Sequence, residues 1–339
     1  MTGRERVLRC LEFDCPDRVP RDVWTLPVAT IEHGREAVDS FLRRWPTDFT
    51  RPPVFSESLI SLCEGDAHKI GRFRDEWGCV FENVQEGVMG EVKQPLLDDW
   101  SKLARLRPPI EALDFDRQAV KTFCASSDRF VLANCCPRPF ERLQFLRGPE
   151  NVYLDLADDS AELGQLLKTV HEFYLSEVQA WAQTDVDGIM FMDDWGSQRS
   201  LLIAPDLWRR RFKPLYEDYV RIAHHAGKKI FMHSDGYIFD IYEDLIEIGV
   251  DAINSQLFCM DLEAIGRRFA GRITFWGEID RQHILPAEDV ETVRQAVRRV
   301  VSSIHRPQGG VIAQFELGAG ARLENAEAVF DTWRTLTES

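Results

Sequence analysis

The chain has 339 residues, of which 44% are hydrophobic and 29% are charged, so its length allows one large domain or two ordinary ones. Its 21 Phe and 9 Trp exclude a chain that stays disordered, because that much apolar surface is buried in a core. The 41 Lys and Arg against 56 Asp and Glu give a net charge of −15, which excludes a general binder of nucleic acids or anionic membranes.

The opening segment and the cysteines indicate where the chain resides. The segment MTGRERVLRCLEF is charged and has no apolar core, so it is not expected to be a secretory signal. No window approaches the roughly 18 uninterrupted apolar residues of a membrane-spanning helix. The eight Cys form no Cys-x-x-Cys pair, and we expect reduced thiols in a cytoplasmic protein.

The first part of the chain predicts a helix followed by irregular additions to the main scaffold. Val7, Leu8 and Leu11 recur at helical spacing within residues 1–13, and CPDRVPRDVW indicates a Pro-rich turn and a short strand. Residues 30–125 contain loops and the stretch DEWGCVFENV, which is typical of a hairpin. In PLLDDWSKL, an Asp before Trp100 predicts the start of a helix.

From residue 129 onward the pattern is regular, and apolar strands alternate with helices. The strands are RFVLANCCP, DGIMFMDD, KKIFMHSDG, VDAINSQ, RITFWGEID and GGVIAQFE. Near-continuous apolar strands separated by helices are typical of a parallel sheet with both faces covered. Six such units, with one or two earlier strands, predict a (β/α)8 TIM barrel with an N-terminal helix and insertions before about residue 129.

We expect this barrel to form a single domain over residues 1–339. A doubly wound open sheet is the alternative architecture. It is disfavoured because no Gly-x-Gly-x-x-Gly motif follows a strand.

Polar residues gather at the predicted carboxyl ends of the strands, where barrels carry their chemistry. These ends read Asn134-Cys135-Cys136, Asp193-Asp194, His233-Ser234-Asp235, Asn254-Ser255-Gln256, Trp276-Gly277-Glu278-Ile279-Asp280 and Gln314-Phe315-Glu316. Asp and Asn at such junctions often cap the next helix, but capping needs neither His233 nor Glu316. Acids and a His that converge on one rim predict a catalytic or metal site.

The spacing within these strand ends narrows the roles. Adjacent residues of a strand point to opposite sides, so only one of Asp193 and Asp194 should face the barrel axis, unless a bend turns both inward. His233 and Asp235 share a face and, with Glu316, would offer a nitrogen and two carboxylates to zinc or another divalent ion. A structural His bonded to a carboxylate is the equal alternative. Trp276 could be a pocket wall or core.

The ordered strand ends resemble the uroporphyrinogen decarboxylase superfamily, which includes haem-pathway decarboxylases and corrinoid-linked methyltransferases. RERVLRCLEFDCPDRVP looks like the opening helix and turn of that family. The segments that look like the methyltransferase-type branch are FERLQFLRG, DDWGSQ, KKIFMHSDG, EIGVDAINSQ, ITFWGEIDRQHIL and the closing LEN. The resemblance implies the TIM barrel and a homodimer.

Departures from the family patterns bear on the activity. The decarboxylases share an early Arg-Gln-Ala-Gly-Arg stretch and a late Asn-Leu-Gly-His-Gly, whereas this chain has PRDVWTLPVATIEHGR and Ala319 in those places. This chain resembles the methyltransferase branch in the DDxGxQ pattern and in His233. Asp235, however, stands where that branch has a Cys, and Glu316 lies near the place of another Cys. Oxygen ligands leave a harder ion, which suits polarising an ether or hydroxyl oxygen.

The leading hypothesis is therefore a methyltransferase of this superfamily that moves a methyl group between a small O- or N-methyl compound and a corrinoid protein or acceptor. The expected metal ligands, for a divalent ion such as zinc, are His233, Asp235 and Glu316. The expected catalytic residues are Asp193, Asp194 and His233. The expected substrate-binding residues are Asn254, Gln256, Trp276, Glu278 and Gln198.

Two alternatives stay open. The first is a decarboxylase or lyase acting on a small carboxylated substrate that is not a porphyrin. In it Arg21, Arg138 or Arg142 would hold the carboxylate, and Asp193 or Asp194 would protonate the carbanion. The second is a catalytically silent binding protein, since both the decarboxylase His and the thiolate ligands are missing.

Overall fold

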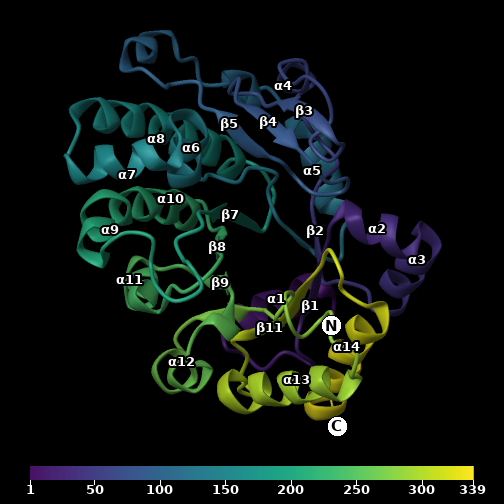
Figure 1. The fold of residues 1–339 in the computed structure, drawn as a ribbon. Coiled ribbons are helices and arrows are strands. Elements are labelled where there is room, and N and C mark those ends of the chain that lie inside the picture. Colours follow the sequence, from purple (N-terminus) through teal and green to yellow (C-terminus); the bar gives the residue numbers. More distant parts are fainter. Residues whose placement is uncertain (339) are drawn as a thin grey trace.

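The computed structural model describes residues 1–338, and its parallel strands curve around a common centre (Figure 1). Six strands are hydrogen-bonded in parallel in the order β1-β11-β10-β9-β8-β7, and β2 pairs in parallel with β6. The bounds are β1 Arg21–Thr25, β2 Phe49–Thr50, β6 Phe130–Val131, β7 Gly188–Met192, β8 Lys229–Ser234, β9 Ala252–Ser255, β10 Thr274–Trp276 and β11 Val311–Leu317.

Backbone hydrogen bonds insert the β2–β6 pair between β1 and β7 and so close the ring. On one side the Asp48 N–H donates to the Arg21 carbonyl at 2.8 Å. On the other side the Ala133 N–H donates to the Gly188 carbonyl at 2.9 Å, and the Asp187 N–H donates to the Val131 carbonyl at 2.8 Å. The predicted TIM barrel, with two strands before residue 129 and six after it, is confirmed.

Helices follow the strands and cover the outside of the ring (Figure 1). Several begin at a side chain that accepts a backbone N–H of the first turn, as Asp116, Ser160 and Asp261 do. The helices after β1, β2 and β6 are α2 Pro27–His33, α3 Arg35–Arg44, α5 Arg117–Ser126, α6 Pro139–Arg147, α7 Pro149–Ala157 and α8 Ala161–Ala182. Those after β7 to β11 are α9 Pro205–Arg211, α10 Lys213–His225, η3 Phe239–Ile241, α11 Tyr242–Ile248, η4 Leu257–Cys259, α12 Leu262–Phe269, α13 Val290–Ile304 and α14 Leu323–Thr337.

The predicted N-terminal helix is α1, Gly3–Leu11, which starts with a capping box between Thr2 and Glu5. Its Val7 and Leu11 belong to the same buried cluster as Phe49, Phe231 and other residues inside the ring. Helix α1 therefore covers the end of the barrel at which the strands begin.

An insertion between β2 and α5 lies beside α6 and α8 and is drawn in blue at the top of Figure 1. It contains α4 Glu57–Ile60, η1 Trp100–Arg105, η2 Ile110–Leu113 and an antiparallel sheet of β3 Gly71–Arg74, β4 Val80–Asn83 and β5 Glu91–Gln94. The predicted hairpin is thus confirmed. The helix expected near Trp100 is a 3₁₀ helix, capped by the Asp99 carboxylate, which accepts the Ser101 N–H at 2.7 Å.

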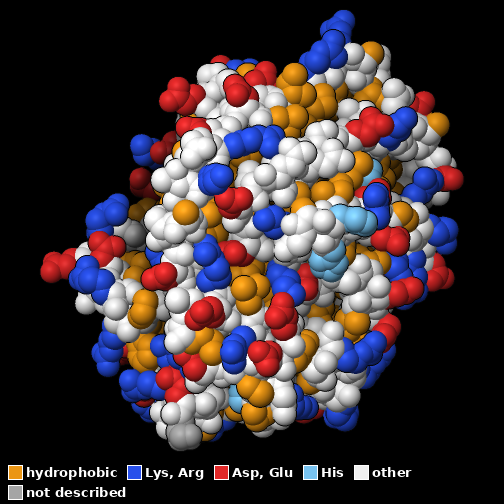
Figure 2. Space-filling model, turned by 180° about the vertical axis from the view of Figure 1, so that it is seen from behind, with side chains coloured by type: hydrophobic (Ala, Val, Ile, Leu, Met, Phe, Trp, Pro, Cys, Tyr) orange, Lys and Arg blue, Asp and Glu red, His pale blue; other side chains and the backbone are white. Residues whose placement is uncertain are grey.

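The surface is mixed in charge on the face shown in Figure 2, where Lys and Arg alternate with Asp and Glu and hydrophobic side chains lie in small groups. All eight cysteines lie among the described residues and are free thiols. Within residues 1–338, no helix combines the length and the apolar character needed to cross a bilayer.

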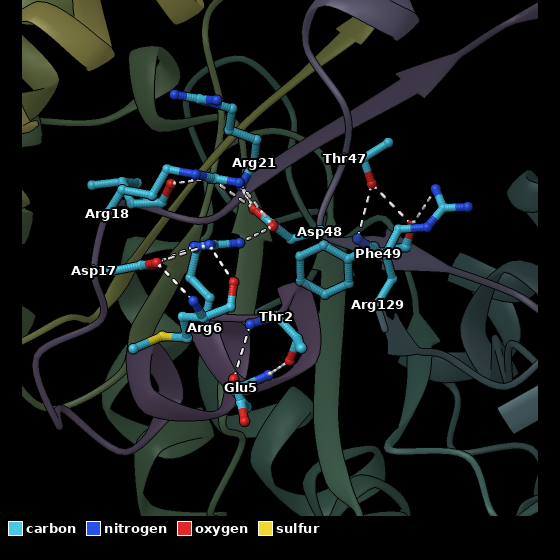
Figure 3. Close-up of polar contacts among 12 residues, drawn as sticks. Thr2, Glu5, Arg6, Asp17, Arg18, Arg21, Thr47, Asp48, Phe49 and Arg129 are labelled. Carbon is cyan, nitrogen blue, oxygen red and sulfur yellow. Dashed lines mark hydrogen bonds and ion pairs between the residues drawn. The ribbon is translucent and has the colours of Figure 1, made fainter. Parts of the chain in front are cut away.

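A buried carboxylate, Asp48, connects α1, β1 and β2 at the closed end of the barrel (Figure 3). It accepts hydrogen bonds from the guanidinium of Arg6 at 2.6 Å, from that of Arg18 at 2.9 Å, and from the backbone N–H of Arg21 at 2.7 Å. Arg6 also binds Asp17, which is nearer the surface. The Asp48 carboxylate therefore joins the start of β2 to α1, to the turn before β1 and to β1 itself.

Two other carboxylates repeat this arrangement at other boundaries between strands of the ring. Asp187, which precedes β7, accepts the Val131 N–H of β6 at 2.7 Å. Asp251, which precedes β9, accepts the Ile230 N–H of β8 at 2.8 Å. In each case an Asp at the start of one strand fastens the neighbouring strand.

We expect Asp48→Ala to lower the free energy of unfolding by about 3–5 kcal/mol, because it removes the buried carboxylate that two largely buried guanidinium groups share. Urea denaturation measures this. The control is Asp17→Ala, which removes the other carboxylate on Arg6, one whose side chain is 40% exposed, and should cost at most about 1 kcal/mol. Equal losses in the two variants would contradict the central place of Asp48.

Candidate metal centre at the barrel mouth

Three side chains converge where β7 and β8 end. Asp194 follows β7, His233 lies near the end of β8, and Asp235 follows β8. The His233 Nε2 atom is 3.6 Å from Asp194 Oδ1 and 3.6 Å from Asp235 Oδ1. One ligand atom of each residue lies within 4.8 Å of the other two, so a nitrogen and two oxygens surround one point.

Two glycines allow the loops that carry these carboxylates to approach each other. Gly196 lies two residues after Asp194, and Gly236 is the residue directly after Asp235. A Cβ atom at Gly196 would lie 2.2 Å from the Tyr237 nitrogen, and a Cβ atom at Gly236 would lie 2.1 Å from the Gly196 oxygen. Gly236 also has a φ of +76°. The two loops therefore touch backbone to backbone, which holds the two carboxylates beside His233.

The orientation of the His233 ring follows from a chain of hydrogen bonds. The Asn254 amide nitrogen donates to the Trp276 carbonyl at 2.5 Å and to Gln314 Oε1 at 2.9 Å. Since a carbonyl only accepts, the Asn254 oxygen must face His233 Nδ1, 2.7 Å away, and accept its proton. A neutral His233 then carries its proton on Nδ1 and directs the lone pair of Nε2 toward Asp194 and Asp235.

The two carboxylates are held differently. Asp194 Oδ1 accepts the backbone N–H of Asp235 at 2.9 Å, and burial raises the pKa of Asp194. Asp235 Oδ2 is bound by the guanidinium of Arg281. Asp235 Oδ1, the oxygen that faces His233, is buried and has no hydrogen-bond partner among residues 1–338. Buried polar atoms normally have a hydrogen-bond partner or a ligand, so this oxygen is placed to bind a group other than the protein itself.

Asp193 points away from this group, as the alternation of strand side chains requires when the strand does not bend. Its carboxylate accepts the N–H groups of Phe140 at 3.0 Å and Glu141 at 2.8 Å and the hydroxyl of Tyr216 at 2.6 Å. Asp193 therefore anchors the first turn of α6 and is fully buried there. Of the two adjacent carboxylates, Asp194 is the one at the mouth.

One of the predicted metal ligands does not join the three side chains at the mouth. Glu316, at the end of β11, lies outside the group formed by Asp194, His233 and Asp235. Its carboxylate is 3.5 Å from Nε of Arg281, the same guanidinium that binds Asp235. Arg281 was not predicted, because the interpretation of the segment after β10 ended at Asp280.

The predicted substrate residues are divided between the mouth and the core. Gln198, Gln256 and Glu278 line one cavity of about 60 Å³. Asn254 is buried beneath His233 and positions it. Trp276 was expected among the substrate residues with the core as its alternative, and it is fully buried inside the ring, as the core alternative requires.

Below the mouth, Trp276 and a second indole share a carboxylate that the sequence interpretation missed. Trp276 Nε1 donates to Asp22 Oδ2 at 3.0 Å, and Trp24 Nε1 donates to the same oxygen at 3.2 Å. Burial raises the pKa of Asp22 to about 6. The Trp24 ring packs edge-on against the His233 ring, with centroids 5.1 Å apart, so this carboxylate supports the floor of the mouth.

Three arginines were candidates for holding the carboxylate of a decarboxylase substrate, and they lie in different surroundings. Arg21 begins β1 and binds Glu338, so it is at the closed end of the barrel and cannot serve the mouth. Arg142, in α6, is neutralised by Asp75 at 2.5 Å and Glu76 at 3.3 Å. Arg138, at the start of α6, has no comparable pair among the described residues.

With this geometry in place, the comparisons with known proteins identify the family. The family model described as uroporphyrinogen decarboxylase (URO-D) matches residues 75–336, and the chain belongs to that family. No curated protein matches the chain in sequence.

Two solved structures show how far the fold is shared. A methyltransferase from Methanosarcina mazei is 16% identical with a TM-score of 0.68, and 99% of each chain is covered. A 3-keto-D-glucoside 4-epimerase from E. coli is 12% identical with a TM-score of 0.39, over 65% of this chain and 84% of that chain. The first likeness establishes the fold, and the second is too distant to support an argument.

The hydrogen bond from His233 to Asn254 generates a prediction that needs no metal. In the wild-type protein at a pH where His233 is neutral, ¹⁵N NMR should show the proton on Nδ1. In Asn254→Leu, which keeps the volume but removes the acceptor, the ring should become a mixture of tautomers. The ring signals of His171, which is bound by Tyr219 and Asp218, should not change. A wild-type proton on Nε2 would contradict the assigned geometry.

Proposed function

We propose that the chain is a methyltransferase of the uroporphyrinogen decarboxylase family that binds a divalent metal ion through Asp194, His233 and Asp235. It moves a methyl group from a small O- or N-methyl compound to a corrinoid carried by a partner protein. The observation that carries the proposal is the group of three ligand atoms within 4.8 Å, one of which is a buried oxygen without a partner. The shared fold with a methyltransferase supports the choice of reaction.

The residues present fit a metal ion. One imidazole nitrogen and two carboxylate oxygens form a donor set that zinc accepts, and three protein ligands leave a position open for substrate. The outer partners also fit, because a metal-binding His is normally held through its other nitrogen, as Asn254 holds His233. Arg281 occupies Asp235 Oδ2 and leaves Oδ1 free for the ion.

A bound divalent ion would act as a Lewis acid toward the oxygen or nitrogen of the methyl donor. The residues of the chain have three tasks around it. Asn254 keeps the His233 lone pair directed at the site, and Arg281 offsets the charge of Asp235 and Glu316. We assign the polar end of the substrate to Gln198 and Gln256, which line the small cavity.

For an O-methyl donor, the bond between the methyl carbon and the oxygen would have to break, and a reduced corrinoid of the partner protein would supply the electron pair that accepts the methyl group. The electron pair of the broken bond stays on the oxygen, which must then gain a proton. We assign this proton to Glu278, a buried carboxyl whose pKa burial raises well above its usual range, which favours its protonated form.

Metal content tests the ligand set. Plasma mass spectrometry of the purified wild-type protein should find about one divalent ion per chain. Asp194→Ala and Asp235→Ala should lose it, because each removes one of three ligands. Glu316→Gln is the control and should keep the ion, since Glu316 lies outside the group. Metal that survives in Asp194→Ala and disappears in Glu316→Gln would contradict the assigned ligands.

Turnover tests the reaction. Metal-loaded protein with reduced cobalamin and a methoxylated compound should form methylcobalamin, followed by visible absorbance, and chelation should abolish it. In Glu278→Gln the metal content should not change, while the rate should fall by about 10²-fold, the lower range for loss of a general acid. Carbon dioxide released from a carboxylated substrate without cobalamin would instead support the decarboxylase alternative.

A further inference from the structure

A second cavity lies between the insertion and helices α6 and α8, and none of Asp194, His233 and Asp235 lines it. Its volume is about 390 Å³, and it adjoins a further cavity of about 630 Å³ through shared wall residues. Those shared residues are Asp75, Glu76, Trp77 and Pro109. Both volumes lie in the range of cavities that hold small organic molecules.

Aromatic side chains form much of the wall of the 390 Å³ cavity. They are Phe73, Trp77, Phe81, Phe145, Phe173 and Tyr174. Their packing fixes the wall, because Trp77 meets Phe173 edge-on at 5.1 Å and Phe81 meets Phe145 at 5.2 Å. Such rings offer flat apolar surfaces on which another ring can stack or meet edge-on.

Most of the charges around the cavity neutralise one another. The Arg142 guanidinium is bound by Asp75 and Glu76 and lies over the Trp77 ring, 5.1 Å from its centroid. Asp75 additionally accepts the backbone N–H groups of Trp77 at 3.0 Å and Cys79 at 2.7 Å. These groups hold the insertion against α6, and each of their charges already has an opposite charge as its partner.

Arg138 is the exception. Its Nε lies 3.5 Å from the Cys136 carbonyl, its Nη1 lies 3.7 Å from Glu141 Oε2, and it makes no closer polar contact with residues 1–338. Glu141 Oε2 itself accepts no hydrogen bond from these residues. The guanidinium side chain is 28% exposed and lines the cavity, so free donor positions face that space. The planar fork of a guanidinium matches a carboxylate in geometry and charge.

Glu177, on α8, also lines the cavity, and its carboxyl group makes no hydrogen bond to the described residues. Burial raises its pKa to about 7. Glu177 therefore holds a proton in a substantial fraction of molecules at neutral pH, and a protonated carboxyl can donate to an ether or carbonyl oxygen. Arg138 is thus the one guanidinium of the cavity wall that has no close carboxylate partner among residues 1–338.

We propose that this cavity binds a small aromatic carboxylic acid, whose carboxylate pairs with Arg138 and whose ring packs against the aromatic wall. The site is distinct from the group of Asp194, His233 and Asp235. It uses no metal ion, so the inference does not rest on the proposed methyl transfer.

Isothermal titration calorimetry of the full-length protein tests this directly. Benzoate and 4-methoxybenzoate should bind, whereas benzamide, which has the size of benzoate but no charge, should bind at least about tenfold more weakly. Arg138→Gln should weaken the binding of both acids by about tenfold or more. Arg105→Gln is the matched control, because Arg105 is an exposed cation that lines only the adjoining cavity, and it should bind the acids as the wild type does.

The comparison of benzoate with benzamide uses the wild-type protein, so it remains decisive if Arg138→Gln fails to fold. Equal affinity for the two compounds, no binding of either acid, or unchanged binding in a folded Arg138→Gln protein would each overturn the proposal. Binding should persist in Asp194→Ala and after chelation. Binding of the acid can therefore be confirmed even if methyl transfer is not observed. Methyl transfer can likewise be confirmed even if no acid binds.

Discussion

Closure of the barrel depends on carboxylates placed at the starts of strands. Strands β2 and β6 are each two residues long, so their own ladder holds little of the ring together. At this weak place Asp48 accepts from β1 and two arginines, and Asp187 accepts from β6. A buried carboxylate with several charge-assisted donors can replace missing ladder bonds. The remaining strands, and the site at their far ends, are arranged around a ring closed in this way.

From the closed ring, strand register determines the geometry of the mouth. Strand β8 lies between β7 and β9, with His233 paired with Met192 on one side and with Asn254 on the other. This register brings the Asn254 amide to His233 Nδ1, and the next residues along the chain bring Asp194 and Asp235 to Nε2. The orientation of the His233 imidazole is thus determined by the register of the sheet. The position of the two carboxylates is determined by two glycine-containing loops.

Sequence reasoning predicted the barrel because the strands after residue 129 are apolar runs, and burial on both faces produces such runs. It did not locate β2, since two residues carry no periodicity. At the mouth, the alternation of side chains predicted that one of Asp193 and Asp194 faces inward, but the pattern is symmetric and did not say which one. That choice depends on where α6 begins, because its first N–H groups bind Asp193.

Other errors at the site had the same origin, since they concern contacts between segments far apart in sequence. Glu316 was expected beside His233, and Arg281 holds it instead. Trp276 was assigned to the pocket, although Asp22, 254 positions away, holds its indole inside the ring. A long polar side chain such as Arg281 has no periodic signature, and its partners are determined only once the loops are folded.

The insertion has a consequence for how this protein can diverge. The cavity between the insertion and α6 draws part of its wall from residues that take no part in the hydrogen bonding of the barrel, such as Phe73, Phe81 and Met89. Substitutions there can reshape the cavity without disturbing the strands or the group at the mouth. The scaffold can therefore acquire new ligand preferences through drift in one surface segment, while selection on the barrel preserves its folding.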